Sequence, residues 1–464
     1  MRCSRALALA ALCVLAPALS GCAPSGKPLV ILTTTDVMGK TSPCGCHTPK
    51  GGLARRAAYV DSVRKAQGDV LVLDAGGFFP FSMYESETVP FMLAEMSRMG
   101  TRAAGVGPAE LRFGYAFARE QSRAAGVPLL CANLVLRDGD KLAFESERIF
   151  EAAGVRVGVF GLLKEDAYLG PASDSLHVTP VLAAARGAVE RLHAQGAQVV
   201  VALAQLGRAP SESLAVKVPG IDLVVSGGSV PVEDRAFQAG RSRVLHGGAQ
   251  GWSMGVAEAR VDPKGSLRSI EARTVELGPD VRSDRAMAKR VQVFEDSLNA
   301  RLRARQVSFG TASMNQGAPH YLGQAGCVRC HQSQYAQWRT TAHARAWRTL
   351  VDLQKESTPR CVSCHVTGLG EPGGFQTASD AARAGDVQCE ACHGMGTEHQ
   401  RWQDNGSKIA ESVCRGCHTS ETSPTFSLAD YRPHVLHSPP PGLKPLPISP
   451  ARRQMQAGRD PHAR

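Results

Sequence analysis

Four copies of the pattern Cys-x-x-Cys-His in the C-terminal third constrain this chain more than any other feature. Two thiols three positions apart lie on one side of a helical turn, where they can add to the two vinyl groups of one haem. The histidine that follows can then coordinate the iron from the proximal face. Zinc sites and redox dithiols also use Cys-x-x-Cys, but neither chemistry needs a histidine directly after the second cysteine. The pattern predicts four c-type haems attached through Cys327, Cys330, Cys361, Cys364, Cys389, Cys392, Cys414 and Cys417, with His331, His365, His393 and His418 as proximal ligands.

The iron atoms also need ligands on the opposite face of each haem. A histidine a few positions after a proximal histidine cannot reach that face of the same haem, so it serves a different one. His399 is such a residue, because it follows His393 across a glycine-rich bend. Crossed ligation of this kind would hold the haems in one cluster. The candidate distal ligands are His343, His399, His437 and His320, with His434 as a weaker one, and a surface or propionate-binding role stays open for each.

Residues 318–437, which contain all four patterns, show little strand periodicity and many cysteines, histidines and glycines. Such a segment cannot bury enough side chain to fold unaided, so its core must be the haems. We therefore expect a mainly α, haem-cored cytochrome domain. Its interleaved aromatic residues favour packing against haem over stacking on bases, and no nucleic-acid partner is expected. Redox proteins are the expected partners, as electron donor and acceptor.

The first residues are typical of a bacterial lipoprotein signal. Ala6 to Leu19 form an apolar run too short to span a bilayer, and it ends in Leu19-Ser20-Gly21-Cys22. In such a sequence Cys22 is lipidated and becomes the mature N-terminus; the alternative is an ordinary signal peptide with an unrelated cysteine. We expect residues 1–21 to be removed and 22–27 to form a lipidated linker. The protein would then be exported and anchored by lipid to a bacterial membrane facing the periplasm, with the outer membrane or cell surface as alternatives.

The formal net charge of +11 would by itself favour an acidic partner such as nucleic acid. Each haem carries two propionates, however, so four haems add roughly eight negative charges that the sequence does not count. The basic excess therefore gives no independent indication of a nucleic-acid partner.

Residues 28–277 alternate between apolar strand patterns, such as Leu29 to Leu32 and Val199 to Leu203, and helical patterns. This alternation predicts one α/β domain. Residues 278–317 contain a charged run without Gly or Pro, Ser283 to Arg305, which predicts a connecting helix and a linker. Residues 438–464 are rich in Pro and Arg and are expected to be a disordered tail.

The C-terminal region resembles the tetrahaem cytochrome family of ammonia oxidisers, over residues 318–437. The residues that carry the resemblance are Tyr321-Leu-Gly, Cys330-His331, Tyr335, Trp338, His343-Ala344, Ala346, Gly373-Gly374-Phe375 and Cys389-Glu-Ala-Cys-His-Gly-Met-Gly-x-x-His399. Members accept electrons released in hydroxylamine oxidation. In that family three haems are bis-histidine and one can lack a protein sixth ligand. The resemblance implies an electron-transferring module and does not imply a particular donor.

Residues 28–277 resemble the metallophosphoesterase domain of 5′-nucleotidases, which implies a four-layer α/β sandwich. In that fold two divalent metals lie at the strand ends, where a bridging hydroxide attacks phosphorus. The motifs that carry the resemblance are Thr33-Thr-Thr-Asp36-Val-Met-Gly, Gly51-Gly-Leu-Ala-Arg-Arg56, Leu73-Asp74-Ala-Gly-Gly77 and Asp222-Leu-Val-Val-Ser-Gly-Gly-Ser.

The resemblance fails at the metal ligands. The family's Asp-x-His is Asp36-x-Met38, and its bridging aspartate is Gly77. Where the family has Gly-Asn-His-Glu, this chain has Gly107-Pro-Ala-Glu110. Where the family has a later histidine, this chain has Gln205. In place of the family's final Gly-His-x-His it has Gly227-Gly-Ser-Val230. Only the carboxylates of Asp36 and Asp74 remain, and these cannot hold two hard cations. We expect the dimetal centre to be absent, the phosphoesterase activity to be lost, and the domain to bind a small ligand or to dock the cytochrome domain.

Three further cysteines lie outside the haem patterns and the signal. Cys44-Gly-Cys46-His47 has the wrong spacing for haem attachment and is either a reactive or metal-binding loop or a structural one. Cys131 has an apolar context and is expected in the core. The whole chain is expected to be an electron-transfer lipoprotein. The alternatives are a haem oxidoreductase for a small nitrogen or sulfur species at an open iron, a phosphohydrolase of the 5′-nucleotidase type, and a nucleotide- or partner-binding protein.

Overall fold

The computed structural model of the chain describes residues 28–43, 48–80, 85–139, 141–228, 230–304, 318–353, 355–399, 409–419, 422–423, 425–439 and 442. The signal segment, the lipidation candidate Cys22, and Cys44, Cys46 and His47 lie outside these residues. Every helix within the described ranges is too short or too polar to cross a lipid bilayer.

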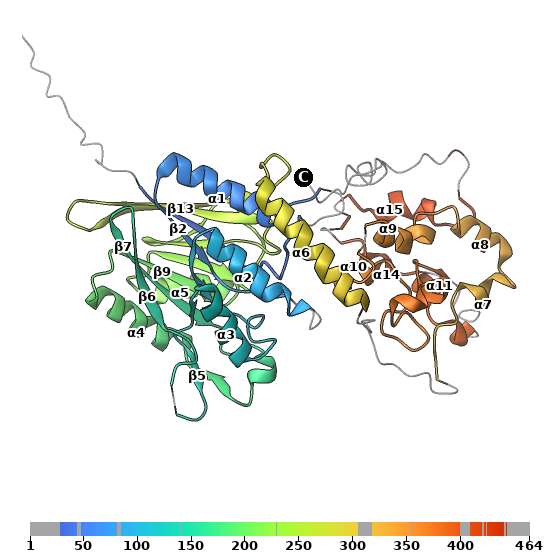
Figure 1. The fold of residues 1–464 in the computed structure, drawn as a ribbon, viewed down its shortest axis with the longest axis horizontal. Coiled ribbons are helices and arrows are strands. Elements are labelled where there is room, and N and C mark those ends of the chain that lie inside the picture. The colour runs from blue at the N-terminus through green and yellow to red at the C-terminus, as the bar shows by residue number, and fades with distance from the viewer. Residues whose placement is uncertain are drawn as a thin grey trace, which may run out of the picture.

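Two six-stranded sheets form the centre of the N-terminal domain (Figure 1). The apolar, β-branched runs of the sequence supply the inner strands, as expected for strands buried on both faces. In spatial order the first sheet contains β14 (Leu267–Glu276), β13 (Ser253–Val261), β1 (Leu29–Thr34), β2 (Val70–Asp74), β3 (Thr101–Gly105) and β4 (Leu129–Leu130). The second contains β11 (Phe237–Ala239), β12 (Ser242–His246), β10 (Leu223–Gly227), β9 (Val199–Gln205), β7 (Val155–Leu163) and β6 (Glu147–Ala152). A small separate pair is formed by β5 (Leu134–Leu136) and β8 (Leu176–Val178).

The two sheets bury one apolar layer between them, which includes Ile31, Leu73, Val157, Val201 and Val225. Helices cover both outer faces. The first sheet is covered by α1 (Leu53–Gln67), α2 (Thr88–Arg98) and α3 (Tyr115–Ala125), and the second by α4 (Val181–Ala194) and α5 (Arg208–Lys217). The expected four-layer α/β sandwich is therefore confirmed. Cys131 is fully buried in it, as predicted, and burial raises the pKa of its thiol to about 12.

Strand direction determines where the polar residues of this domain gather. Strands β1, β2, β3 and β4 run parallel, as do β7, β9, β10 and β12 in the second sheet. The carboxyl ends of parallel strands meet at one edge of a sheet, where ligands of α/β proteins usually bind. Asp36, Asp74, Gln205 and Gly227 all lie at such strand ends.

The C-terminal region is built from short helices joined by loops. They are α7 (Gln324–Val328), α8 (Gln332–Trp338), α9 (Ala346–Asp352), α10 (Pro359–Val362), α11 (Ala381–Ala384), α12 (Cys389–His393), α14 (Glu411–Arg415) and α15 (Leu428–Tyr431). Its largest cluster of buried apolar side chains is small: Leu350, Val362, Val366, Phe375 and Ala384. The protein part of this core is therefore limited, as expected for a domain organised around a cofactor.

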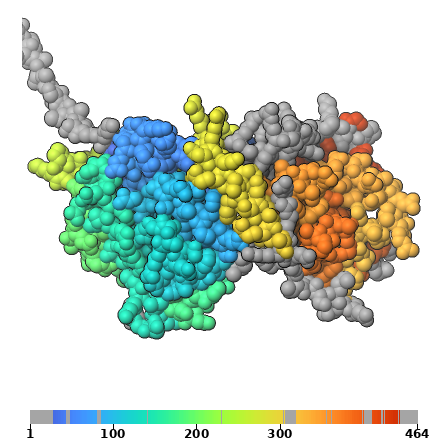
Figure 2. Space-filling view, in the orientation of Figure 1, coloured from blue at the N-terminus to red at the C-terminus, as the bar shows by residue number. Residues whose placement is uncertain are grey.

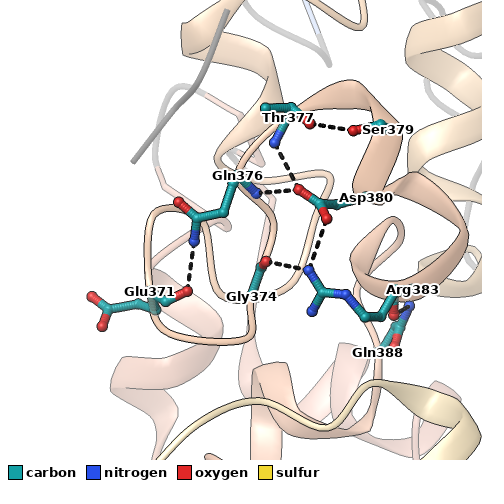
Figure 3. A network of polar contacts seen from close by, with 8 residues as sticks. All are labelled: Glu371, Gly374, Gln376, Thr377, Ser379, Asp380, Arg383 and Gln388. Carbon is teal, nitrogen blue, oxygen red and sulfur yellow. Dashed lines mark hydrogen bonds and ion pairs between the residues drawn. The ribbon is translucent and has the colours of Figure 1, made fainter. Parts of the chain in front are cut away.

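A polar network orders the loop between the second and third haem motifs (Figure 3). Thr377 and Asp380 form a reciprocal capping box, and Arg383 Nη2 donates to Asp380 Oδ1 and to the Gly374 carbonyl, both at 2.9 Å. Gln388 Nε2 donates to the Arg383 carbonyl at 3.0 Å. The loop is thus tied to the residues that lead into α12.

Helix α6 (Arg285–Ala304) lies between the two regions (Figure 1), and Figure 2 shows it along their boundary. It is fixed to the α/β domain by two contacts with α2. Arg290 Nε donates to Glu95 Oε1 at 3.0 Å. The rings of Phe91 and Phe294 stack with centroids 4.0 Å apart and planes 2° from parallel. The helix therefore packs as part of the α/β domain.

Candidate functional site

The four Cys-x-x-Cys-His patterns lie on or next to the short helices α7, α10, α12 and α14. None of their eight cysteines forms a disulfide, so each thiol is available for a thioether bond. The thiol of Cys327 in the first pattern lies close to that of Cys389 in the third. In the same way Cys364 of the second pattern contacts Cys417 of the fourth. Cys392 of the third pattern also lies near Cys414 of the fourth, where α12 contacts α14, so each attachment site adjoins at least one other.

The first and third patterns are also joined by a buried carboxylate. Glu390, inside the third pattern, is 2% exposed. Its carboxylate accepts backbone N–H bonds from Leu322 at 2.8 Å, Gly323 at 2.7 Å and Gly396 at 2.6 Å. Charge-assisted bonds of this kind are stronger than neutral ones. Spacing alone does not identify this residue; the only sequence signal is an acidic residue between the two cysteines of a haem pattern.

Three of the predicted proximal histidines face a candidate distal histidine. The ring centroids are 6.1 Å apart for His331 and His399, 6.2 Å for His343 and His418, and 6.2 Å for His393 and His437. Metal–imidazole nitrogen bonds are about 2.0 Å long. Since a ring centre lies roughly 1.1 Å beyond the nitrogen, two rings on opposite sides of one ion have centres roughly 6.2 Å apart. The three pairs therefore fit a bis-histidine haem iron.

The fourth proximal histidine, His365, has a different environment. Its Nδ1 donates to the Ala346 carbonyl at 2.6 Å and lies 3.1 Å from Thr349 Oγ1. This arrangement places the proton on Nδ1 and leaves Nε2 to bind iron. Within the part of the chain that the structure describes, no histidine ring stacks against His365.

His320 is not brought opposite a proximal histidine among the described residues. Its Nδ1 bonds to the Ala318 carbonyl at 2.9 Å, and its backbone N–H donates to Thr397 Oγ1 at 2.8 Å. These contacts fit a structural role in the segment that leads into the first pattern. His434, at the end of a short 3₁₀ turn, likewise shows no contact with a proximal ring in the described ranges.

Burial favours the neutral form of several of these imidazoles. Desolvation, followed by the neighbouring His418, lowers the pKa of His343 to about 4. Desolvation also lowers the pKa values of His365, His393, His418 and His437. A neutral imidazole has a free lone pair, which is the form that binds metals.

In the α/β domain, Asp36 lies where the dimetal site of the resembling family would be. Its Oδ1 accepts from Gln205 Nε2 at 3.3 Å. Its Oδ2 accepts from the Gly228 N–H at 2.9 Å and from the Thr35 hydroxyl at 3.2 Å. Asp36 is 4% exposed and has a φ of 49°, a strained conformation that often marks functional sites. Its carboxylate is engaged by protein donors.

Asp74 and Glu110 are fully buried near this point and bond to other groups. Asp74 accepts from Thr34 Oγ1 at 2.5 Å and from the Gly76 N–H at 2.8 Å. Glu110 accepts the N–H groups of Gly77, Phe78, Phe79 and Gly107 at 2.7–3.2 Å. Burial raises the pKa of Asp74 to about 6 and that of Glu110 to about 7. Glu110 thus ties the loop after β2 to the loop after β3, which are the loops that would carry metal ligands. The sequence alone does not indicate this role.

The position of the family's bridging aspartate is closely packed. A Cβ atom built on Gly77 would lie 2.3 Å from Asp36 Oδ1 and 3.0 Å from Asp36 Cα. At Gly228, where the family has a histidine, a Cβ atom would lie 3.0 Å from the Gly207 nitrogen. In the described residues no cluster of three or more His, Cys, Asp or Glu side chains is arranged to hold a metal ion. Among the described residues, the side chains at these positions are therefore not a ligand set for a pair of divalent cations.

Comparisons with known proteins agree with the division into two regions. Residues 326–394 match the family model of cytochrome c554 and c-prime. The chain is 34% identical over 99 residues to cytochrome c-554 of Nitrosomonas europaea, which covers 18% of this chain and 42% of that protein. It is 27% identical over 226 residues to the 5′-nucleotidase of Bos taurus, covering 44% of this chain and 39% of the relative. The chain thus spans about two fifths of the length of these relatives.

Solved structures show the same fold for the N-terminal domain. The 5′-nucleotidase precursor from Thermus thermophilus matches with a TM-score of 0.53 and 23% identity, over 61% of each chain. A calcineurin-like phosphoesterase of Bacillus subtilis matches with a TM-score of 0.51 and 19% identity, over 59% of this chain and 98% of the other. Both resemblances expected from the sequence are confirmed: the C-terminal region is related to the cytochrome c554 family, and the N-terminal domain has a 5′-nucleotidase-like α/β fold.

Proposed function

We propose that the protein is a membrane-anchored periplasmic electron-transfer protein with four c-type haems. The observation that carries this proposal is the set of three histidine pairs with ring centres 6.1–6.2 Å apart. Each pair joins a proximal histidine of one pattern to a histidine from a distant segment. When bound, each haem supplies an iron that exchanges one electron between the ferric and ferrous states.

The protein groups hold and orient these irons. The proposed ligand pairs are His331 with His399, His393 with His437, and His418 with His343. His437 Nδ1 donates to Gln337 Oε1 at 3.1 Å, which would leave its Nε2 available to bind iron. The proximity of the first pattern to the third, of the third to the fourth, and of the fourth to the second supports haem edges close enough for electron hopping between them. Redox proteins are the corresponding partners.

A second candidate function is reduction of a small nitrogen or sulfur species at the haem of His365. It is supported by the different surroundings of this ring, which bonds to Ala346 and Thr349 and stacks against no histidine in the described part of the chain. An iron without a protein sixth ligand has a free position for a small molecule.

Absorption and EPR spectra of the mature, full-length protein test the haem proposal. We expect four haems per chain, three low-spin and one high-spin, because only three proximal histidines have a distal partner among the described residues. The mass of the same sample counts the thioether-bound haems and shows whether Cys22 is the lipidated N-terminus. Four low-spin haems would contradict the open position at His365, and fewer than four haems would contradict the attachment assignment.

We further propose that the α/β domain has lost phosphoesterase activity. Asp36 is bonded to Gln205, Thr35 and the Gly228 N–H, and the metal ligands expected from the fold are replaced by glycine, methionine and glutamine. With added Mn²⁺ we expect no measurable hydrolysis of AMP or of a nitrophenyl phosphodiester, and no rise in unfolding temperature. Turnover that required Mn²⁺ and was abolished by Asp36→Ala would refute this. The domain would then be a 5′-nucleotidase-like phosphohydrolase.

A further inference from the structure

The second haem pattern begins at an unusual helix cap. Thr358 is the N-cap residue of α10, which carries Cys361, and Pro359 follows it. A threonine at this position usually accepts a hydrogen bond from the first turn of its helix. Here the side chain makes no such bond. Its hydroxyl instead donates to Asn299 Oδ1 of α6 at 3.0 Å. Thr358 and Asn299 are each 7% exposed, so the bond is shielded from water.

The backbone of Thr358 connects this side-chain bond to the haem-binding helix. Its carbonyl accepts the N–H of Cys361 at 2.9 Å and that of Val362 at 3.2 Å. Val362 is fully buried in the apolar cluster of the cytochrome region. A shift of Thr358 would therefore move the start of α10 and the thiol of Cys361 with it.

Glu295 lies one turn before Asn299 on α6 and bonds to the α/β domain. Its Oε1 accepts from Thr41 Oγ1 at 2.5 Å. Thr41 lies in the loop that continues from Asp36, at the strand end where the metal site has been lost. Residues four positions apart lie on the same face of a helix. The same face of α6 therefore bonds to the Asp36 loop and to the cap of the second haem pattern.

A small pocket that opens to solvent lies at this junction, lined by Thr41, Thr88, Asn299, Lys355 and Thr358 among others. Residues of α6 and of the segment before α10 therefore line the same space. Since Asn299 and Thr358 are buried and directly bonded, a displacement of α6 acts on Thr358 through this bond.

We propose that the α/β domain positions the haem of His365 through α6, with the Asn299–Thr358 bond as the contact. Asn299 and Thr358 are positioning residues that set ligand access and potential at that iron. The α/β domain thus acts as a structural regulator of one haem of the four, at the place where its own metal site has been lost. This inference rests on the proposed open coordination at His365.

Thr358→Val in the full-length holoprotein removes the hydroxyl and keeps the shape. We expect at least a threefold change in the rate of CO binding to the dithionite-reduced protein, and a shift in the midpoint potential of the high-spin haem only. Asn299→Leu removes the same bond from the α6 side and should have the same effect. Thr358→Ser retains the hydroxyl and should behave as wild type. Gln292→Leu is the matched control, since Gln292 bonds to Asp296 on the exposed side of the same helix.

The outcomes separate the two claims. If wild-type protein binds CO and both bond-removing variants bind it at the wild-type rate, the positioning role is wrong. If wild-type protein binds no CO, the open coordination is wrong. In that case the positioning role predicts that one of the four low-spin EPR signals changes in Thr358→Val, and four unchanged signals would contradict it. Loss of the second haem alone in Thr358→Val and Asn299→Leu would support positioning. Loss of all four haems would contradict a local role.

Discussion

Replacing His343 with glycine is expected to convert one low-spin haem into a second high-spin haem, and to double the CO bound per reduced chain. The ring of His343 lies 6.2 Å from that of His418, the separation of two imidazoles on one iron. Burial lowers its pKa to about 4, so it is a neutral ligand across the physiological pH range. Glycine leaves a cavity beside the iron that water or CO can enter. EPR and CO titration measure the change.

His320→Gly is the matched control for this substitution. The ring of His320 bonds to the Ala318 carbonyl at 2.9 Å and faces no proximal histidine in the described structure, so its removal should leave the spin states unchanged. Added imidazole should restore the low-spin signal of His343→Gly by occupying the cavity. A His343→Gly spectrum identical to that of wild type, or a new high-spin haem in His320→Gly, would show that the ligand pairs are assigned wrongly.

The contrast between His343 and His320 shows what the sequence could predict in the cytochrome region. Attachment cysteines and proximal histidines form local patterns, because one helical turn places all three groups against one haem. Distal ligands come from distant segments, so sequence patterns identify candidates but not their partners. The structure brings His343, His399 and His437 against proximal rings and leaves His320 elsewhere. Such pairing depends on how the loops pack, which no local spacing encodes.

The α/β domain shows a different limit of prediction from the sequence. Its fold was predictable, because strand patterns are local. The aligned motifs also predict that metal ligands are replaced. The contacts made at those positions were not predictable. Gln205 now bonds to Asp36 across the two sheets, and Glu110 accepts four backbone N–H groups in the interior. Buried polar groups need hydrogen-bond partners, and which groups become their partners depends on how the two sheets pack in the folded domain.

Restoring the family's bridging carboxylate with Gly77→Asp is therefore expected to destabilise the α/β domain by about 2–4 kcal/mol, without creating a metal site. Gly77 has a φ of 75°, and its Cβ would lie 2.3 Å from Asp36 Oδ1 and 3.0 Å from Asp36 Cα. The backbone cannot easily move away, because the Gly77 N–H donates to buried Glu110 Oε2 at 2.9 Å. The new carboxylate would also add a like charge beside Asp36. Thermal and urea unfolding, with and without Mn²⁺, measure the effect.

Gly126→Asp separates the backbone cost from the packing cost. Gly126 has a φ of 70° and a ψ of 22°, the left-handed helical region, and a Cβ there meets nothing within 4 Å. This control should therefore lose only the roughly 1 kcal/mol expected of a residue with a side chain in that region. If Gly77→Asp were as stable as Gly126→Asp and Mn²⁺ raised its unfolding temperature, the cleft would still accept a metal, and its filling by Asp36 and Gln205 would be reversible. A larger loss in Gly77→Asp that Mn²⁺ does not relieve would mean that packing, and not only the missing ligands, excludes the metals.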